Sequence, residues 1–372
     1  MAATFCDAGF LSVWFVIRHQ SKHSPCAEGD SPGEATHRGG GSERRLGRGE
    51  TPRAARGVEV GILPLALFCN GHGYFVQRTF EWMHLQPYAV HATYTFDGAG
   101  GVPKQHRFRE AGLWLVEDDE YYAPQRFLTF DGTVPKDMLL ANPPAGDLGT
   151  HLNALQSHLS GIRGALAVAR ATGRVLLLPK LTCYCDKTWG GHDNIFKSKC
   201  KYPGAEGGDF LPLQCPLDHF LSPSAWVEAG VPFRTESYLR DARVPKAVRD
   251  SKIVRMEVVP RGQLGGSGPQ LPEGASDDDV HTAFASLEHV PIVELSNARA
   301  AFCRFNNASE DAIFEKLMND VMRPVAWCSE CHPEGCAHWV KKETLLTGRV
   351  VPTRGVHEMF CRDYQIPPRT CK

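Results

Sequence analysis

A long apolar stripe, followed by a glycine and a short apolar run, constrains the fold of this chain most. Apolar side chains recur at three- and four-residue intervals, which predicts a helix with one buried face, at Leu152, Leu155, Leu159, Ile162, Leu166 and Ala169. Thr150 is placed to cap the start of this helix and Gly173 to follow its end. Val175 to Leu178 then predicts a buried strand, which Pro179 ends. A helix, a glycine turn and a fully apolar strand are typical of an α/β layer, so we expect an α/β fold.

Further elements are expected on both sides of this pair. An apolar run ends in Asn70-Gly71-His72-Gly73, which is a strong turn signal, and Asp97 to Gly101 reads as a glycine-rich loop. We expect strands over residues 87–94, 252–259 and 290–295, and helices over residues 74–85, 104–114 and 311–321.

Length and composition divide the chain into regions. With 372 residues, two domains are the natural expectation. Residues 1–60 are rich in Arg, Gly and Ser and are predicted to be disordered or not native to the protein. Residues 61–125 form a first unit, the Pro-rich segment 126–150 is interpreted as a linker, and residues 151–372 form a second α/β domain with a Cys-rich tail.

Charge and hydropathy exclude some classes of function. Lys and Arg number 41 against 42 Asp and Glu, so no field of one sign favours nucleic acid as a partner. The apolar run from Phe10 to Ile17 is shorter than the ~20 residues of a membrane span, so no transmembrane segment is expected.

The 13 cysteines are clustered, which suits either an oxidising lumen or a metal site. Four of them lie between Cys183 and Cys215. In the tail, Cys328, Cys331, His332, Cys336 and His338 have spacing compatible with zinc, and disulfides are the alternative. The sequon at Asn307 agrees with a lumenal location.

The chemically useful side chains are densest between residues 67 and 114. His91 closes a predicted strand, the glycine-rich loop follows, and then come Lys104, Arg107 and Arg109. An imidazole can ligate a divalent cation, glycines let the backbone approach phosphate, and cations neutralise a departing diphosphate. This layout is compatible with a metal diphosphate, whereas each residue taken alone is compatible with a structural role, in which the arginines would pair with Glu110 or Asp97.

Several blocks of sequence, in one order, resemble a known family. They are Leu67 to Arg78, Leu85 to Thr93, His106 to Trp114, Ile162 to Ala169, Val175 to Pro179, Trp189 to His192, Cys215 to His219 and Trp327-Cys328. These blocks cover most of the chain from about Gly61 onward. They strongly resemble plant and green-algal Golgi arabinosyltransferases of glycosyltransferase family 77, of the type that extends hydroxyproline-linked arabinose chains on extensins.

The resemblance implies the C-terminal remnant of a GT-A nucleotide-diphospho-sugar transferase domain, followed by the second α/β domain. It implies a UDP-sugar donor, a hydroxyproline-rich glycoprotein acceptor, a retaining transfer and a divalent cation, usually Mn²⁺. By this resemblance His91 matches the metal ligand, and Lys104 and Arg107 would bind the donor diphosphate. Asn70 and His72 would lie near the donor or acceptor pocket.

The chain departs from the family pattern at its front. The family's donor domain carries an Asp-x-Asp metal motif, whereas the Asp-x-Asp of this chain is Asp277-Asp278-Asp279, in what reads as a solvated acidic loop. We therefore expect an incomplete catalytic domain, inactive on its own. The alternatives are a non-catalytic lumenal module that holds acceptors or partner transferases, and a zinc-binding interaction protein.

Overall fold

The computed structural model describes residues 15–18, 53–54, 58–98, 100–136, 139, 148–184, 212–219 and 221–321. The chain divides into two compact units. The first comprises Met1–Tyr74 and Arg78–His91, and the second comprises Phe75–Gln77 and Ala92–Lys372. In the described residues, no helix is both long and apolar enough to cross a bilayer.

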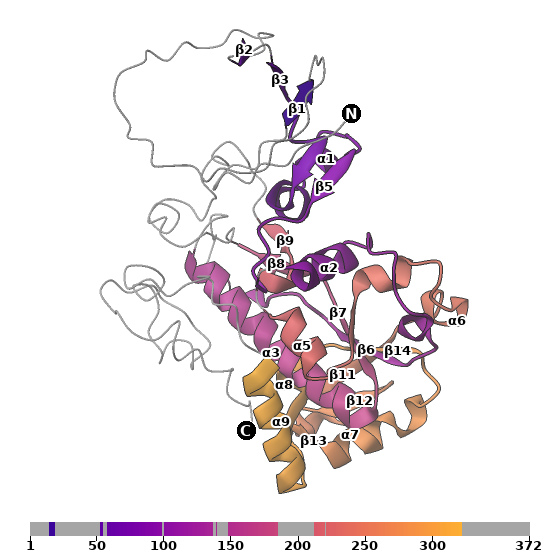
Figure 1. Cartoon of the computed structure of the whole chain (residues 1–372). Coiled ribbons are helices and arrows are strands. Elements are labelled where there is room, and N and C mark those ends of the chain that lie inside the picture. The colour runs from indigo at the N-terminus through magenta and orange to yellow at the C-terminus, as the bar shows by residue number, and fades with distance from the viewer. Residues whose placement is uncertain are drawn as a thin grey trace. The chain divides into compact units, whose positions relative to one another are not determined.

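The first unit contains short strands and short helices (Figure 1). Its elements are β1 (Phe15–Arg18), β2 (Arg53–Ala54), β3 (Val58–Ile62), β4 (Phe68–Asn70), α1 (Thr79–Trp82) and β5 (Ala89–His91). The π-helix η1 (His72–Gln77) follows β4. The single helix predicted over residues 74–85 is wrong, because Arg78 and His84 adopt left-handed backbone angles (φ 51° and 53°) that interrupt it. The predicted strand over residues 87–94 is confirmed in its centre as β5, which pairs in parallel with β4.

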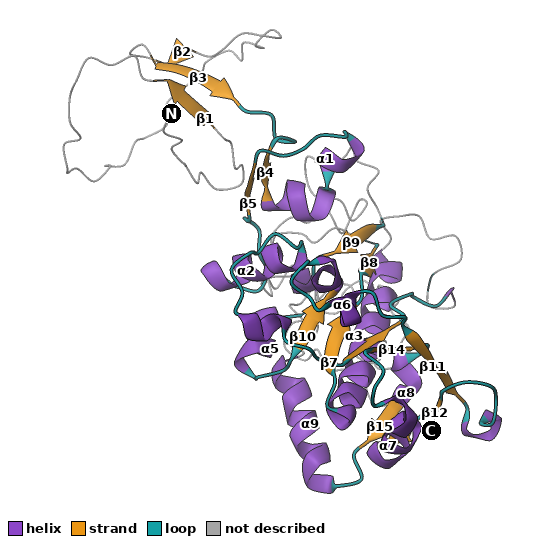
Figure 2. Ribbon diagram, turned by 90° about the vertical axis from the view of Figure 1, so that its right-hand side faces the viewer, coloured by secondary structure: helices purple, strands orange, loops and turns teal. Residues whose placement is uncertain are grey.

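The second unit is built on a six-stranded sheet, visible in Figure 2. The strand order is β10-β7-β6-β14-β11-β12, and every pair is parallel. The strands are β6 (Phe127–Phe130), β7 (Val175–Leu178), β10 (Phe233–Thr235), β11 (Val254–Val259), β12 (Gln270–Pro272) and β14 (Ile292–Leu295). The predicted α/β class is therefore confirmed.

The inner strands send alternate side chains to two separate cores. On β7, Leu176 and Leu178 join the larger core, while Val175 and Leu177 join the smaller one. The larger core holds residues of α3 (Leu148–Thr172), α7 (Asp277–Phe284) and α9 (Ala308–Val321). The smaller core includes Tyr122 and Tyr238. Burial on both faces explains why β7 reads as a continuous apolar run rather than an alternating one.

The apolar stripe is confirmed as α3, and Gly173 follows it with φ 63°, as predicted. Thr150 is not its cap, because α3 begins at Leu148 and Thr150 lies buried within the first turn. Gly164 lets α8 (Ala298–Ala301) approach α3 closely, since a Cβ added at Gly164 would lie 1.9 Å from the carbonyl oxygen of Ala298.

Three expectations are corrected by the second unit. The segment expected to be a linker contains β6, which lies inside the sheet between β7 and β14. Four residues between irregular segments carry too little periodicity to reveal a strand. The helix expected from residue 104 begins at Gly101, as α2 (Gly101–Glu110), so Gly101 belongs to the helix and not to the loop. The acidic run expected in a loop forms the first turn of α7.

The remaining elements connect the sheet and its helices. They are η2 (Asp119–Tyr122), β8 (Leu181–Cys183), β9 (Leu213–Cys215), η4 (Leu217–His219), α5 (Pro223–Glu228), η5 (Glu236–Arg240), α6 (Lys246–Arg249), η6 (Arg261–Gln263), β13 (Ala275–Ser276), η7 (Ala285–Leu287) and β15 (Phe302–Arg304).

Candidate functional site

Two of the predicted site residues occupy neighbouring strand ends in the first unit. Asn70 ends β4 and His91 ends β5, and the two are direct partners in the parallel register. The Asn70 Oδ1 atom accepts the Gly73 N–H at 2.7 Å, which fixes the turn into η1. His72 begins η1 and is buried. The structure therefore places Asn70 and His91 side by side, although their role in a pocket stays a prediction.

Lys104 and Arg107 lie on α2 of the second unit and differ in their surroundings. Lys104 is half-buried, and no described carboxylate forms an ion pair with it. Arg107 is 2% exposed, its Nε donates to Asp218 Oδ2 at 2.9 Å, and its Nη2 lies 2.7 Å from Asp218 Oδ1. The same Nη2 also donates to the carbonyl oxygen of Tyr94 at 3.3 Å. These contacts favour the structural alternative for Arg107, with Asp218 as its partner.

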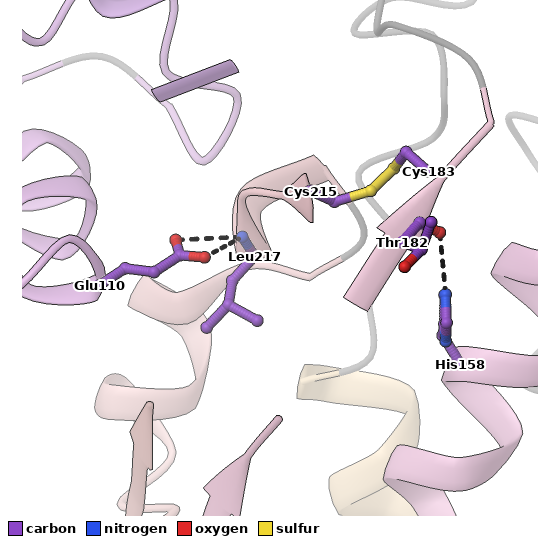
Figure 3. The surroundings of a disulfide bond; sticks show 6 residues. All are labelled: Glu110, His158, Thr182, Cys183, Cys215 and Leu217. Carbon is purple, nitrogen blue, oxygen red and sulfur yellow. Dashed lines mark hydrogen bonds between the residues drawn. A yellow bond between two sulfur atoms is a disulfide. The ribbon is translucent and has the colours of Figure 1, made fainter. Parts of the chain in front are cut away.

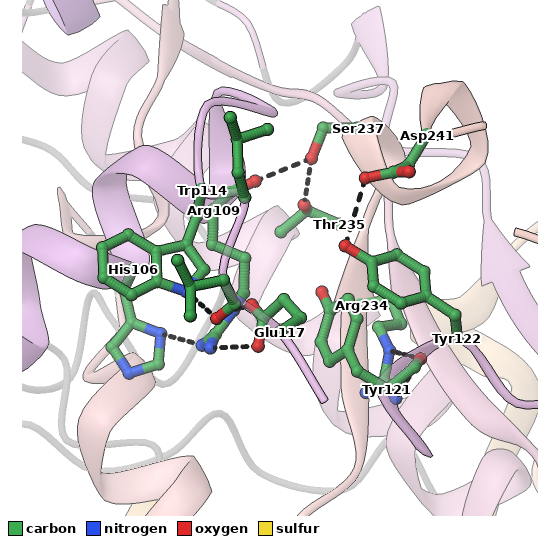
Figure 4. Close-up of polar contacts among 12 residues, drawn as sticks. His106, Arg109, Trp114, Glu117, Tyr121, Tyr122, Arg234, Thr235, Ser237 and Asp241 are labelled. Atoms are coloured by element: carbon green, nitrogen blue, oxygen red, sulfur yellow. Dashed lines mark hydrogen bonds and ion pairs between the residues drawn. The ribbon is translucent and has the colours of Figure 1, made fainter. Parts of the chain in front are cut away.

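Arg109 is held in a cluster of polar and aromatic side chains (Figure 4). Its Nη2 donates to Glu117 Oε2 at 3.0 Å, and its Nε donates to Glu117 Oε1. Its guanidinium carbon lies 5.4 Å from the ring centroid of Tyr121, over which Arg234 also lies, at 3.9 Å. The cluster ties the segment after α2 to strand β10, so Arg109 has a structural role here.

Glu110 and Asp97, the partners expected for the arginines, serve other groups. Both Glu110 oxygens accept the Leu217 N–H, at 3.0 and 3.1 Å (Figure 3). Burial raises the pKa of Glu110 to about 8. Asp97 accepts the N–H of Ser224 at 2.8 Å, at the start of α5. Each carboxylate thus secures a backbone turn.

The described residues do not form a complete manganese site. Among them, no group of three or more His, Cys, Asp or Glu side chains is arranged to hold a metal ion. A hard divalent cation prefers several carboxylate oxygens, and the single imidazole of His91 supplies neither charge nor oxygen.

The Asp277-Asp278-Asp279 run has a structural explanation. Asp279 Oδ2 accepts from the Ser276 backbone N–H at 2.9 Å, which completes a capping box at the start of α7. Asp277 accepts the backbone N–H of Asn306, and Asp278 accepts from the Asn306 side chain. All three carboxylates stand at the positive end of the helix dipole, where anions are stabilising.

A crevice lies at the carboxyl ends of the neighbouring strands β6 and β14. From β6 the chain crosses through α3 to β7 on one side, whereas β14 flanks β6 on the other side. The segments after β6 and β14 both leave the sheet at its carboxyl edge, and α8, after β14, packs against α3. A cavity of about 230 Å³ lies there. Open α/β sheets commonly bind ligands at the carboxyl ends of their strands.

The crevice wall is polar and comes from three segments. Asp131, Gly132 and Thr133 follow β6, and α3 contributes Ser157, His158 and Gly161. The segment after β14 contributes the rest, namely Ser296, Asn297, Ala298 and Arg299.

His158 joins the crevice to the disulfide-bonded hairpin beside it (Figure 3). Its Nε2 lies 3.0 Å from the carbonyl oxygen of Thr182, so Nε2 carries the proton and donates it. Burial, with a smaller contribution from the charge of Arg299, lowers the pKa of His158 to about 4. The imidazole is therefore neutral at physiological pH. Sequence reasoning missed this site, although polar residues directly after the strand over 290–295 were a usable signal.

The cysteine groups are resolved in part. Cys183 and Cys215 form a disulfide between the antiparallel strands β8 and β9, and Cys303 is also disulfide-bonded. Cys69 is a buried free thiol. The tail group from Cys328 to His338 lies outside the described residues, so zinc and disulfides both stay open there.

Comparison with known proteins finds a plant relative. The chain is 31% identical over 294 residues to the arabinosyltransferase XEG113 of Arabidopsis thaliana. The match covers 73% of this chain and 43% of the relative, so the chain spans less than half of the relative's length. No family model and no solved structure matches the chain.

Proposed function

Because the chain is a homologue of a plant arabinosyltransferase, as its sequence motifs indicated, we propose that it takes part in transferring L-arabinofuranose from a UDP-sugar to a glycoprotein. The proposed acceptor is a hydroxyproline-linked arabinoside of a cell-wall glycoprotein. The observation that carries the proposal is the extent of the match, which covers 73% of the chain. The α/β architecture with a parallel sheet agrees with a nucleotide-sugar enzyme.

The residues proposed for the activity are Lys104 in the second unit and Asn70 and His91 in the first. Lys104 is the preferred cation for the departing diphosphate, because its ammonium has no described carboxylate partner, whereas Arg107 is engaged by Asp218. Asn70 and His91 are proposed for the donor or acceptor pocket because they adjoin at paired strand ends. The GT-A assignment for residues 61–125 and the manganese ion stay predictions that rest on the resemblance.

We place the protein in the Golgi lumen. A plant glycosyltransferase acting on a secreted glycoprotein meets its acceptor there, and a disulfide such as Cys183–Cys215 is typical of an oxidising compartment. Asn307 is exposed, as a glycosylated residue must be, although its Oδ1 also accepts the Ser309 N–H at the start of α9.

The second candidate is a non-catalytic module that holds acceptors or partner enzymes. The described residues favour it in one respect, since they provide no carboxylate cluster for a metal ion.

The two functions are separated by a transfer assay on the purified chain. The chain is incubated with UDP-L-arabinofuranose, manganese and a hydroxyproline arabinoside, and the product is followed by mass spectrometry. The proposed activity requires an acceptor lengthened by one pentose, and at least tenfold less product with Lys104→Met than with the matched surface variant Lys316→Met; this result would overturn the inactivity expected from the sequence. An acceptor that is bound but never lengthened would contradict the proposal and support the module.

A further inference from the structure

The turn before α9 carries a motif that the proposed transfer does not use. Asn307-Ala308-Ser309 is the single Asn-x-Ser/Thr sequence of the chain, and its middle residue is not proline. In chains that enter the secretory lumen, such sequences are the acceptors of N-linked oligosaccharides, which are bulky and need a surface position. In Figure 2 the motif lies where the loop after β15 meets the start of α9.

We propose that Asn307 carries an N-linked oligosaccharide. The donor is a lipid-linked oligosaccharide diphosphate. The bond between its first sugar carbon and the diphosphate oxygen breaks, and that carbon forms a bond to Asn307 Nδ2. Nδ2 gives up one proton, and the lipid diphosphate leaves with the bonding electron pair. Because the reaction takes place in the secretory lumen, the inference rests on the lumenal placement in the proposed function.

The hydrogen bonds of Asn307 use its oxygen and leave its nitrogen to the sugar. Oδ1 accepts the backbone N–H of Ser309 at 2.9 Å and that of Glu310 at 3.3 Å, so it caps the first turn of α9. Both partners are donors, so the amide atom that faces them is the oxygen. An N-linked sugar replaces one hydrogen of Nδ2 and keeps the carbonyl, so the cap and the oligosaccharide are compatible.

The surroundings of the motif have room for a bulky hydrated group. Residues 306–310 are all exposed. Phe305, directly before them, is buried, and its ring centroid lies 4.8 Å from that of Phe302 and 5.4 Å from that of Phe314. Its backbone N–H donates to Asp311 Oδ1 at 2.9 Å. The turn is therefore anchored on its inner side and open on its outer side, so an oligosaccharide there would displace no packed side chain.

The position of the motif allows recognition to be separated from folding. Ala308 is the first residue of α9, the position at which a helix accepts proline most readily. Proline in the middle of an acceptor sequence blocks glycosylation. Ala308→Pro should therefore keep α9 and lose the oligosaccharide. Ser309→Ala should do the same, because it removes the hydroxyl of the motif and leaves the Asn307 cap in place.

The test is mass spectrometry of the full chain, directed into the secretory pathway of plant cells by a cleavable signal peptide. We expect a mass excess that a peptide N-glycosidase removes, with residue 307 converted to aspartate by that enzyme. Asn307→Gln, Ser309→Ala and Ala308→Pro should each lose the whole excess, and circular dichroism checks that they fold. The matched control Asn306→Gln changes the neighbouring exposed asparagine, and Ser309→Thr keeps the hydroxyl, so both should retain the excess.

Three results would overturn the inference. The first is an unmodified residue 307 in chain recovered from the lumen. The second is a mass excess that Asn307→Gln keeps in full, which would place the sugar elsewhere. The third is a loss in Asn306→Gln as complete as that in Asn307→Gln, which would show that the motif does not determine the modification.

The inference and the proposed function can fail separately. If the chain from the lumen lengthens the arabinoside acceptor but carries no sugar on Asn307, the inference fails and the proposed function stands. If Asn307 is glycosylated but no arabinose is transferred, the opposite holds.

Discussion

Replacing Gly164 by alanine tests the packing that positions one wall of the crevice. The added Cβ would lie 1.9 Å from the carbonyl oxygen of Ala298, and real contacts of this kind are not shorter than about 3 Å. Because the obstacle is backbone on the neighbouring α8, it cannot move aside as a flexible side chain would.

Two opposing effects set the magnitude. Alanine is favoured over glycine inside a helix by about 1 kcal/mol, because glycine loses more backbone entropy on folding. Overpacking a tight core costs about 1–3 kcal/mol and occasionally more, and a displacement of over 1 Å between two helices lies at the upper end. We therefore expect Gly164→Ala to lower the free energy of unfolding by about 2 kcal/mol, which corresponds to a Tm decrease of roughly 4–8 °C.

Two further glycines calibrate the measurement, which uses thermal and urea unfolding followed by circular dichroism. Gly161→Ala would meet only the edge of the Phe130 ring, at 3.1 Å, so a smaller loss is expected. Gly262→Ala has nothing within 4 Å and should change stability by less than about 0.5 kcal/mol. A Gly164→Ala variant as stable as the unaltered chain would refute the close approach of α8 to α3.

Three other predictions concern titration and the disulfide. The pKa of Glu110 is raised to about 8, so the stability that its protonated form confers should be lost as the pH rises from about 5 through 8. Urea unfolding at pH 5 and at pH 8.5 measures this loss, which should be absent in Glu110→Gln. The pKa of His158 is lowered to about 4, so the neutral imidazole should contribute roughly 2–3 kcal/mol to the free energy of unfolding, and this should be lost as the pH falls from about 6.5 through 4. His158→Gln should show no such loss. Removing the disulfide with Cys183→Ala and Cys215→Ala together should cost about 3–4 kcal/mol, given a sequence separation of 32, whereas unchanged unfolding in reductant would contradict the bond.

Strong periodic patterns predicted the fold well where they were long. The stripe from Leu152 to Ala169, Gly173 and the strand ended by Pro179 all appear as expected, because one buried face and one turn residue determine them locally. The strand β6 was missed because four residues carry little pattern, and its place between β7 and β14 depends on partners distant in sequence. Local signals also misplaced the cap at Thr150, since α3 begins at Leu148, four residues before the first residue of its apolar stripe, Leu152.

The site was predictable only in part. A turn signal and a predicted strand end pointed to Asn70 and His91, and parallel pairing makes them neighbours. Buried charge partners were not predictable, because Asp218 is brought to Arg107 by the fold and not by sequence spacing. The crevice was missed for the same reason: its polar residues come from three distant segments, and serines or asparagines after a strand are ordinary loop residues when taken one at a time.

The most direct test of the nucleotide assignment is a structure of the chain determined with UDP. We predict the diphosphate beside Lys104, the cation proposed to neutralise it. Well-ordered UDP bound away from Lys104 would contradict the proposal.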